Sequence, residues 1–140
     1  MLENVFPKAE TMAVRPWGKE ECLVLASKKY IFKRLTIRAG CRGGLQYHRL
    51  KDECGYVLKG KLKIILDDGS GKLVTFVKGE GDVFHFPPGL VHQEEALEDC
   101  IILEVTTPHA NDRVRMESSY GIVGDDKGLP TTKLCDVEHL

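Results

Sequence analysis

The sequence predicts an all-β fold, a single antiparallel sandwich or barrel, and three observations point to it. Short runs of alternating, β-branched residues recur about every ten residues along the chain. Turns rich in Gly, Pro and Asp separate these runs, and no long amphipathic helical period is visible between residues 30 and 107. The length of 140 residues suits one domain with one hydrophobic core.

The elements follow from these runs in order. The expected strands are 30–37, 45–48, 54–58, 62–66, 73–77, 83–86 and 100–106. The loop DDGSGK at 67–72 supplies the glycines that a hairpin turn needs. Residues 1–14 carry no strong period, and the segment from 122 onward is rich in turn residues. We therefore expect an N-terminal arm at 1–14, a barrel at 15–121 and a C-terminal tail at 122–140.

Charge and composition exclude several classes of partner. Lys and Arg number 20 against 21 Asp and Glu, for a net charge of −1, so neither nucleic acid nor an anionic membrane is an expected partner. No apolar run is long enough to span a membrane, and the first residues lack the pattern of a signal peptide. The five cysteines are odd in number, well separated and form no CxxC pair. Free thiols in a reducing, cytoplasmic setting are the expectation.

Two clusters of polar residues have the composition of a metal site. Gln46 and His48 alternate, so they share one face of their strand, and Glu53 begins the next extended run. His92 follows a Pro-Pro-Gly turn about forty residues later. Two imidazoles, one carboxylate and one amide oxygen suit one borderline divalent ion (Zn, Fe, Mn, Co or Ni). Such a ligand set leaves one or two positions open for substrate or water.

The spacing of these residues resembles the two motifs of the cupin family. The first motif is matched by Gly40-(x)5-Gln46-x-His48-(x)4-Glu53-(x)6-Gly60, in which Gln46 stands where cupins usually have a first histidine. The second is matched by Gly81-(x)5-Pro87-x-Gly89-(x)2-His92, with Ala96 at the final position in place of Asn. The resemblance implies an RmlC-like double-stranded β-helix, a jelly-roll barrel with the metal inside its mouth.

Residues 15–121 also resemble the cupin module of type II phosphomannose isomerases. The matching segments are RPWG at 15–18, KRLT at 33–36, LQYH at 45–48, Glu104-Val105 and Arg115-Met116-Glu117. A glutamine at the first ligand position is itself typical of that family. The chain departs from the family at Leu50, Lys51, Gly55, Ser118, Ser119 and Ile122. The metal set is thus kept while part of the substrate-contacting set is changed, so the same substrate is not implied.

Three hypotheses on function follow. The first is a metal-dependent isomerase or epimerase of a sugar or sugar phosphate, in which a base moves a proton between adjacent carbons. The candidate bases near the site are Glu94, Glu95, Lys51 and Glu53. The second is a non-haem Fe(II) oxygenase, because two histidines and one carboxylate form a facial set, although Gln46 as a fourth ligand favours non-redox chemistry. The third is a non-catalytic module that binds a small molecule.

Further residues are candidates for supporting roles. Arg34 and Arg38 alternate along one face of the strand 30–37 and its end, where they either bind a substrate anion at the barrel mouth or form a solvated outer face. Arg115 is a third candidate for substrate binding. His85 is expected on the surface or barrel wall, and Cys54 on the opposite face from Glu53. Open sheet edges predict a homodimer in which the arm and the tail cover them.

Overall fold

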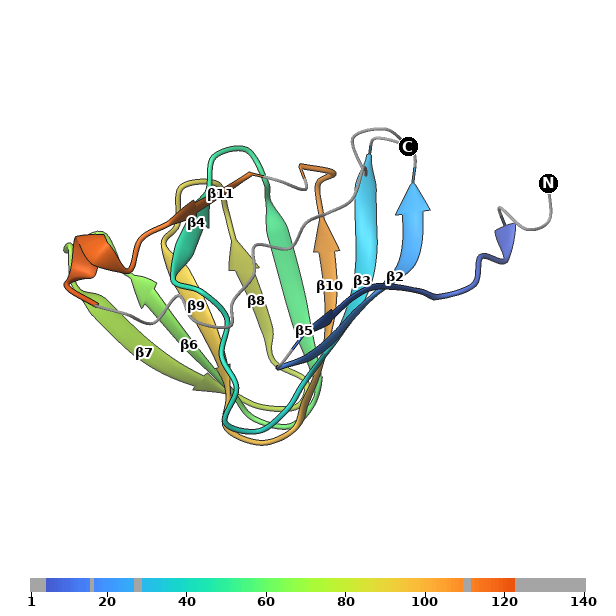
Figure 1. The fold of residues 1–140 in the computed structure, drawn as a ribbon, viewed down its shortest axis with the longest axis horizontal. Helices are drawn as coiled ribbons and strands as arrows, with labels where there is room; N and C mark the ends of the chain where they lie inside the picture. Colours follow the sequence, from blue (N-terminus) through green and yellow to red (C-terminus); the bar gives the residue numbers. More distant parts are fainter. Residues whose placement is uncertain (1–4, 16, 27–28, 110–111, 123–140) are drawn as a thin grey trace.

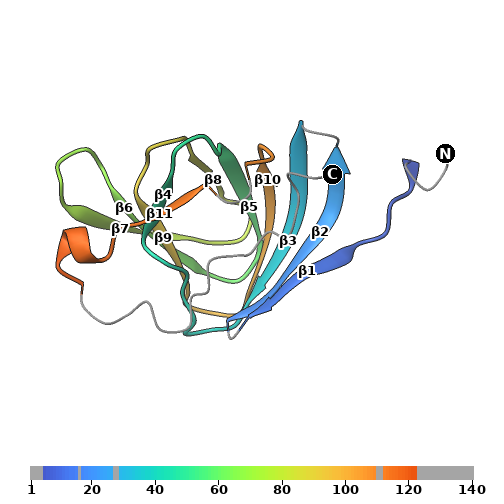
Figure 2. The same cartoon turned by 45° about the horizontal axis from the view of Figure 1, so that its top comes forward.

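The computed structural model describes residues 5–15, 17–26, 29–109 and 112–122. Two antiparallel sheets pack face to face, in the strand orders β1-β2-β3-β10-β5-β8 and β11-β4-β9-β6-β7 (Figures 1 and 2). The elements are β1 (Glu10–Arg15), β2 (Gly18–Ala26), β3 (Tyr30–Ile37), β4 (Gln46–His48), β5 (Glu53–Lys59), β6 (Leu62–Asp67), β7 (Leu73–Lys78), β8 (Val83–Phe86), β9 (His92–Ala96), β10 (Cys100–Thr106), β11 (Arg113–Arg115) and the 3-10 turn η1 (Ser118–Tyr120). The all-β, jelly-roll prediction is confirmed.

All the expected strands are present, and three of them, β3, β8 and β10, have the predicted bounds. Four strands were not expected: β1, β2, β9 and β11. Residues 10–14 of the predicted arm belong to β1, which pairs antiparallel with β2 at the edge of the six-stranded sheet. Of the predicted tail, Ile122 alone lies within the described residues.

In the larger sheet, the inward side chains of β3, β5 and β10 are apolar toward one end of the strand and charged toward the other. At one end they are apolar: Leu35 of β3 and Val57 of β5 both lie opposite Ile102 of β10, and all three belong to the core cluster. Two residues further along, the same register places Lys33 opposite Glu104. Alternation thus builds an apolar layer that closes one end of the sandwich and a charged layer that lines the other end.

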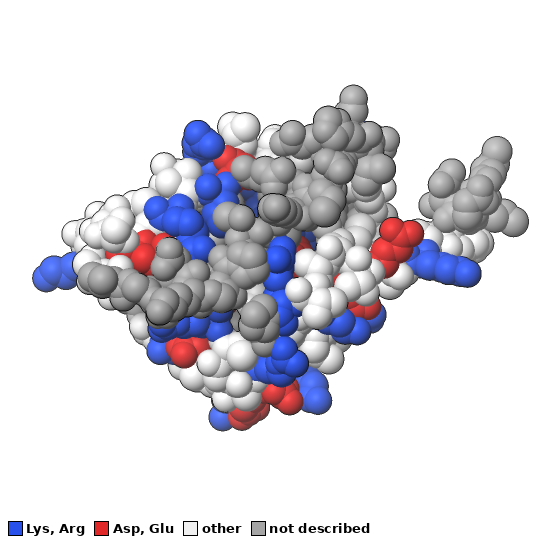
Figure 3. All heavy atoms as spheres, in the orientation of Figure 1, with Lys and Arg blue, Asp and Glu red and all other residues white. Residues whose placement is uncertain are grey.

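The surface carries both signs of charge. Basic side chains are interspersed with acidic ones over the described part of the face in Figure 3. Within the described residues, no helix is long and apolar enough to cross a membrane.

The turn between β5 and β6 requires glycine, and this gives a first prediction. Gly60 has a φ of +90°, and a Cβ at this position would lie 2.2 Å from the carbonyl oxygen of Asp99. Gly60→Ala should therefore lower the free energy of unfolding by about 2 kcal/mol, because it combines backbone strain with a clash.

Gly69 provides the matched control. Its φ is +98°, but a Cβ there would meet nothing within 4 Å. Gly69→Ala should cost only about 1 kcal/mol, the backbone part alone. Equilibrium denaturation in urea measures both variants, and equal losses would show that the contact with Asp99 is relieved at no cost.

Candidate metal centre

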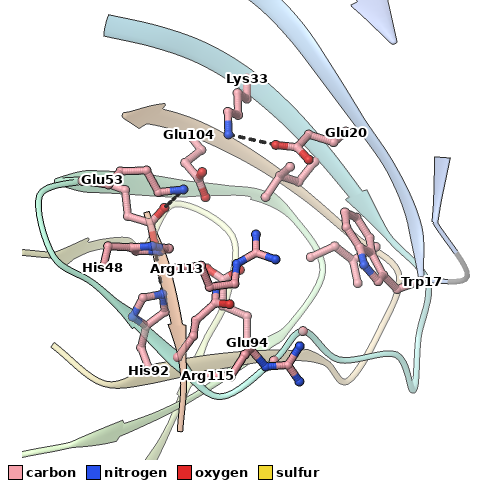
Figure 4. A pocket seen from close by; sticks show the side chains of 16 residues that line it. Trp17, Glu20, Lys33, His48, Glu53, His92, Glu94, Glu104, Arg113 and Arg115 are labelled. Atoms are coloured by element: carbon pink, nitrogen blue, oxygen red, sulfur yellow. Dashed lines mark ion pairs between the residues drawn. The ribbon is translucent and has the colours of Figure 1, made fainter. Parts of the chain in front are cut away.

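Three buried side chains meet at the charged end of the sandwich. His48 is the last residue of β4, Glu53 the first of β5 and His92 the first of β9. Glu53 Oε1 lies 3.3 Å from His48 Nε2 and 3.0 Å from His92 Nε2 (Figure 4). The two imidazole centroids are 5.3 Å apart, and the His92 ring stacks on Phe86 at 4.1 Å. The structure therefore brings together the three residues predicted from motif spacing.

The outer nitrogen of each ring is fixed by the backbone. His48 Nδ1 lies 3.0 Å from the carbonyl oxygen of Asp112, and His92 Nδ1 lies 2.9 Å from that of Leu90. A carbonyl oxygen only accepts, so each Nδ1 carries a proton and donates it, which leaves Nε2 of a neutral ring with its lone pair. This backbone support is typical of metal-ligating histidines.

The Nε2 atoms of the two histidines and the facing oxygen of Glu53 need a positively charged partner. His48 Nε2 is buried and makes no hydrogen bond within the described residues. Two lone pairs and a carboxylate oxygen converge on one point, so either extra protons or a cation must lie between them. A divalent ion satisfies all three groups at once, and the donor set suits Zn, Fe, Mn, Co or Ni. The residues present thus fit a metal, which His48, Glu53 and His92 would hold.

Gln46 occupies the place expected of a fourth ligand. It lies two residues before His48 on β4, it pairs in register with His92 of β9, and it lines the same cavity. Its amide oxygen is a donor that a borderline cation accepts. All four predicted metal residues therefore line one cavity, with Glu53 contributed by the six-stranded sheet and the other three by the five-stranded sheet.

The cavity around this centre is densely charged. The acidic and basic residues among its lining are Glu20, Glu53, Glu94, Glu104, Lys33, Lys51, Arg113 and Arg115. Lys33 Nζ lies 2.8 Å from Glu20 Oε1 (Figure 4). Lys51 Nζ lies 3.6 Å from Glu53 Oε2. The acidic and basic groups balance in number, so a bound divalent ion would make the site net positive and favourable to an anionic substrate.

The carboxyl groups of the cavity are held in different protonation states. Burial alone would raise the pKa of Glu53, but Lys51, His48 and His92 outweigh it and hold that pKa well below its usual range. Burial and the charges of Glu104 and Glu53 raise the pKa of Glu94 well above its usual range. Burial and the charge of Glu53 raise the pKa of Glu104 to about 8. Near neutral pH the cavity thus offers one carboxylate ligand and carboxyl groups that can carry a proton.

The structure separates the candidate bases. Glu94 and Lys51 both line the cavity. Glu95 points away from it and forms an ion pair with Lys63 at 2.8 Å, so the prediction that Glu95 lies at the site is wrong. Strand alternation is the reason, because Glu94 shares the inward face of β9 with His92.

The structure also decides between the two interpretations of Arg34 and Arg38, which were substrate binding at the barrel mouth or a solvated outer face. Arg34 donates to both carboxylate oxygens of Glu21, at 3.1 and 2.9 Å, and Arg38 donates to a backbone carbonyl 3.3 Å away. Neither lines the cavity, so the placement of Arg34 and Arg38 at the barrel mouth is corrected to the outer face. The inward row contains Lys33, which is buried because it pairs with Glu20.

Other expected residues lie where the sequence indicated. Arg115 lines the cavity, and its guanidinium pairs with Glu117. Trp17, of the RPWG segment at 15–18, carried no stated expectation, and it packs against the core cluster and lines the cavity. Cys54 is exposed on the outer face, as is His85. Four cysteines are free, and Cys135 and His139 lie outside the described residues.

Sequence reasoning missed Glu20, Glu104 and Arg113. The sequence did indicate the position of Glu104. It alternates with Cys100 and Ile102 in an otherwise apolar row, and this pattern predicts that its side chain faces inward. Glu20 and Arg113 lie in strands that were not expected, and their sequences are too polar or too short to signal a strand.

A ligand substitution tests the centre. His92→Ala should weaken Mn²⁺ binding by about 100-fold, the upper end of what even supporting residues contribute to metal sites. Isothermal calorimetry on protein stripped with chelator measures the affinity, and far-ultraviolet circular dichroism checks the fold. His109→Ala is the control, because His109 bonds to Thr107 away from the centre. Unchanged Mn²⁺ affinity in His92→Ala would place the metal elsewhere.

The fold and the site together define a class: a small β-sandwich with a histidine- and carboxylate-rich centre at its open end. Residues 33–109, more than half of the chain, match the family model described as Cupin domain. The chain belongs to the cupin family.

Known proteins with similar sequences or folds extend this result. A stretch of 65 residues is 31% identical to oxalate decarboxylase OxdC of Bacillus subtilis (strain 168), and it covers 46% of this chain and 17% of that relative. The chain thus matches only a minor part of that protein's length. Among solved structures, KdgF from Halomonas sp. has a TM-score of 0.63 at 21% identity, covering 74% of this chain and 91% of that one.

Two further solved structures share the fold. An RmlC-like cupin from Shewanella frigidimarina has a TM-score of 0.64 at 21% identity, over 75% of this chain and 88% of that one. The capsular polysaccharide assembling protein CapF of Staphylococcus aureus has a TM-score of 0.67 at 16% identity, over 77% of this chain and 31% of that one. At these identities the likeness establishes the fold.

Proposed function

We propose that the chain is a metal-dependent isomerase or epimerase that acts on a small, anionic sugar derivative such as a sugar phosphate. The observation that carries this proposal is the position of Glu94, a carboxyl group that lines the same cavity as His48, Glu53 and His92 and shares the inward face of β9 with His92. When bound, a divalent cation supplies Lewis-acid stabilisation of negative charge that develops on substrate oxygens.

Glu94 is the residue to which we assign proton transfer. It shares the inward face of β9 with His92, so a substrate held beside the metal ligands lies within its reach. Aldose–ketose interconversion and epimerisation both require one group to remove a proton from carbon and return it. Lys51 is already paired with Glu53 Oε2, so we assign it the task of positioning the carboxylate ligand.

The substrate class follows from the charge of the cavity. Arg113 and Arg115 both lie on β11 and line the cavity, on the side where β11 pairs with β4. Guanidinium groups bind phosphate or carboxylate by charge-assisted hydrogen bonds. Among the similar proteins, one is an oxalate decarboxylase and another a capsular polysaccharide assembling protein. An acidic or sugar-derived substrate is in keeping with both.

A second candidate is non-haem Fe(II) chemistry. His48, Glu53 and His92 form the set of two histidines and one carboxylate that suits Fe(II) oxygenases. Gln46 on the same wall supports the isomerase, because a fourth protein ligand leaves less room for both oxygen and substrate. A binding module without catalysis is the third possibility.

Solvent-exchange measurements separate these candidates. The protein, loaded separately with Mn²⁺, Fe²⁺, Zn²⁺, Co²⁺ or Ni²⁺, is incubated in D2O with a panel of hexose and pentose phosphates. Deuterium at C1 or C2, detected by NMR, is the expected result, and His92→Ala with no added metal is the control. Absence of exchange across the panel would overturn the isomerase proposal. Substrate-dependent oxygen uptake with Fe²⁺ would favour the oxygenase, and saturable binding without turnover would favour the binding module.

We also propose that the chain is a homodimer. The edges of the six-stranded sheet are β1 and β8, and an open edge offers unpaired backbone groups to a second subunit. Size-exclusion chromatography with light scattering tests this directly, and a monomer mass would overturn it.

A further inference from the structure

A second cluster of potential metal-ligating residues lies on the outer face of the six-stranded sheet. Asp52, Cys54 and His85 each offer one ligand atom, and these atoms all lie within 4.8 Å of one another. His85 Nε2 is 2.6 Å from Asp52 Oδ1. None of the three takes part in the centre described above, because they lie on the opposite side of β5 from Glu53.

The strand register builds this cluster. Cys54 of β5 lies directly opposite His85 of β8 in the antiparallel ladder, so their side chains leave the same face as neighbours. Asp52 lies two residues before Cys54 and therefore projects to that face as well. Its backbone is fixed at both ends: its N–H donates to Thr107 Oγ1 at 3.1 Å, and its carbonyl accepts from Thr107 N at 3.0 Å.

We propose that Asp52, Cys54 and His85 bind a second divalent cation, of the zinc class. Carboxylate, thiolate and imidazole are the three side-chain ligands that Zn²⁺ uses in proteins. With metal–ligand bonds of their usual length, the donor atoms of a tetrahedral site lie about 3.4–3.6 Å apart. The side chains of His85 and Asp52 are 56% and 44% exposed, so small rotations can bring the donor atoms to that spacing, with His85 Nε2 and Asp52 Oδ1 moving apart from their 2.6 Å contact.

The surroundings favour a metal over other uses of these groups. Cys54 and His85 also line an apolar hollow with Phe32, Tyr56 and Leu103. Apolar side chains on this side of the cluster limit the access of water to Cys54 and His85.

Cobalt spectroscopy tests this site separately from the central one. Within the described residues the central centre has no cysteine ligand, so a thiolate-to-Co²⁺ charge-transfer band reports the outer site alone. The expected result is a band that grows with added Co²⁺ under reducing conditions and is bleached by Zn²⁺, which binds more tightly. No band in the wild-type chain would overturn the proposal and leave Asp52 and His85 as a surface ion pair.

Variants identify the ligands. Cys54→Ser should abolish the band, and Asp52→Asn and His85→Ala should each weaken Co²⁺ binding at the band by at least about tenfold. Cys22→Ser is the matched control, because Cys22 is a free thiol on β2 outside the cluster. A band that survives in Cys54→Ser would assign it to another cysteine and overturn the site. His92→Ala should keep the band, which makes failure at one centre distinguishable from failure at the other.

Discussion

Glu94→Gln should lower kcat for the proposed isomerisation by about 10²–10⁴-fold, the usual contribution of one general acid–base group. The substitution keeps the size and polarity of the side chain on the cavity wall and removes its ability to exchange a proton. Metal affinity and the fold should be unchanged, because His48, Glu53 and His92 hold the ion. The measurement is the rate of deuterium incorporation into substrate at saturating concentration, with metal content determined on the same sample.

Glu95→Gln is the matched control for this variant. Glu95 is the next residue on β9, faces outward and pairs with Lys63. Its replacement should leave both kcat and KM unchanged. If Glu94→Gln retains the rate of the wild-type chain, the proton is moved by another group, and Lys51 is the next candidate on the cavity wall.

Lys33→Met should lower the free energy of unfolding by about 3–5 kcal/mol, the cost of removing one partner from a buried ion pair. The Lys33 side chain is 3% exposed and its partner Glu20 is 6% exposed, with Nζ 2.8 Å from Oε1. The cation also faces Glu104, directly across the β3–β10 ladder. Its removal leaves the buried carboxylate of Glu20 without its ion-pair partner, so that this group must bind a proton or admit water.

Two companion variants give this prediction its control. Lys19→Met removes an exposed lysine of β2 that pairs with Glu21 of the same strand at 3.5 Å, and it should cost no more than about 1 kcal/mol. The double variant Glu20→Gln/Lys33→Met should recover part of the loss, since a neutral pair replaces a lone charge. Urea denaturation measures all three, and equal losses for the two lysine variants would show that the buried pair is not a stabilising feature.

The sequence predicts the strands that obey simple alternation. β3, β8 and β10 combine β-branched or aromatic residues with a clear inward row, and their bounds were found without the structure. The candidate metal ligands were predicted for a different reason: motif spacing places His48, Glu53 and His92 at strand ends that the fold brings together. Turn glycines can also be recognised in the sequence, because a turn with a positive φ, such as that of Gly60, is a backbone conformation that other residues rarely adopt.

The rest depends on partners that lie far away in sequence. After Gly18, β2 continues with Lys19, Glu20 and Glu21. These residues resemble a solvated loop until the β2–β3 register places Lys33 and Arg34 beside them. β9 reads HQEEA, in which the inward residues are polar because they face the metal centre rather than the core. The face of β3 that carries Arg34 was ambiguous for the same reason. A lysine can be buried on the other face only when acidic partners lie beside it, and those partners come from strands far away in the sequence.

The unequal pairing of the strands that carry the metal ligands has a consequence for how the centre opens. β5, which carries Glu53, is paired along both edges, with β10 and β8. β4, which carries His48, has three residues and pairs with β9 at one register position. Local unfolding begins where backbone pairing is sparse, so amide protons of β4 and β11 should exchange with deuterium before those of β5 and β10. A bound ion would tie β4 to β5 and slow that exchange, which makes hydrogen–deuterium exchange a direct reading of metal occupancy.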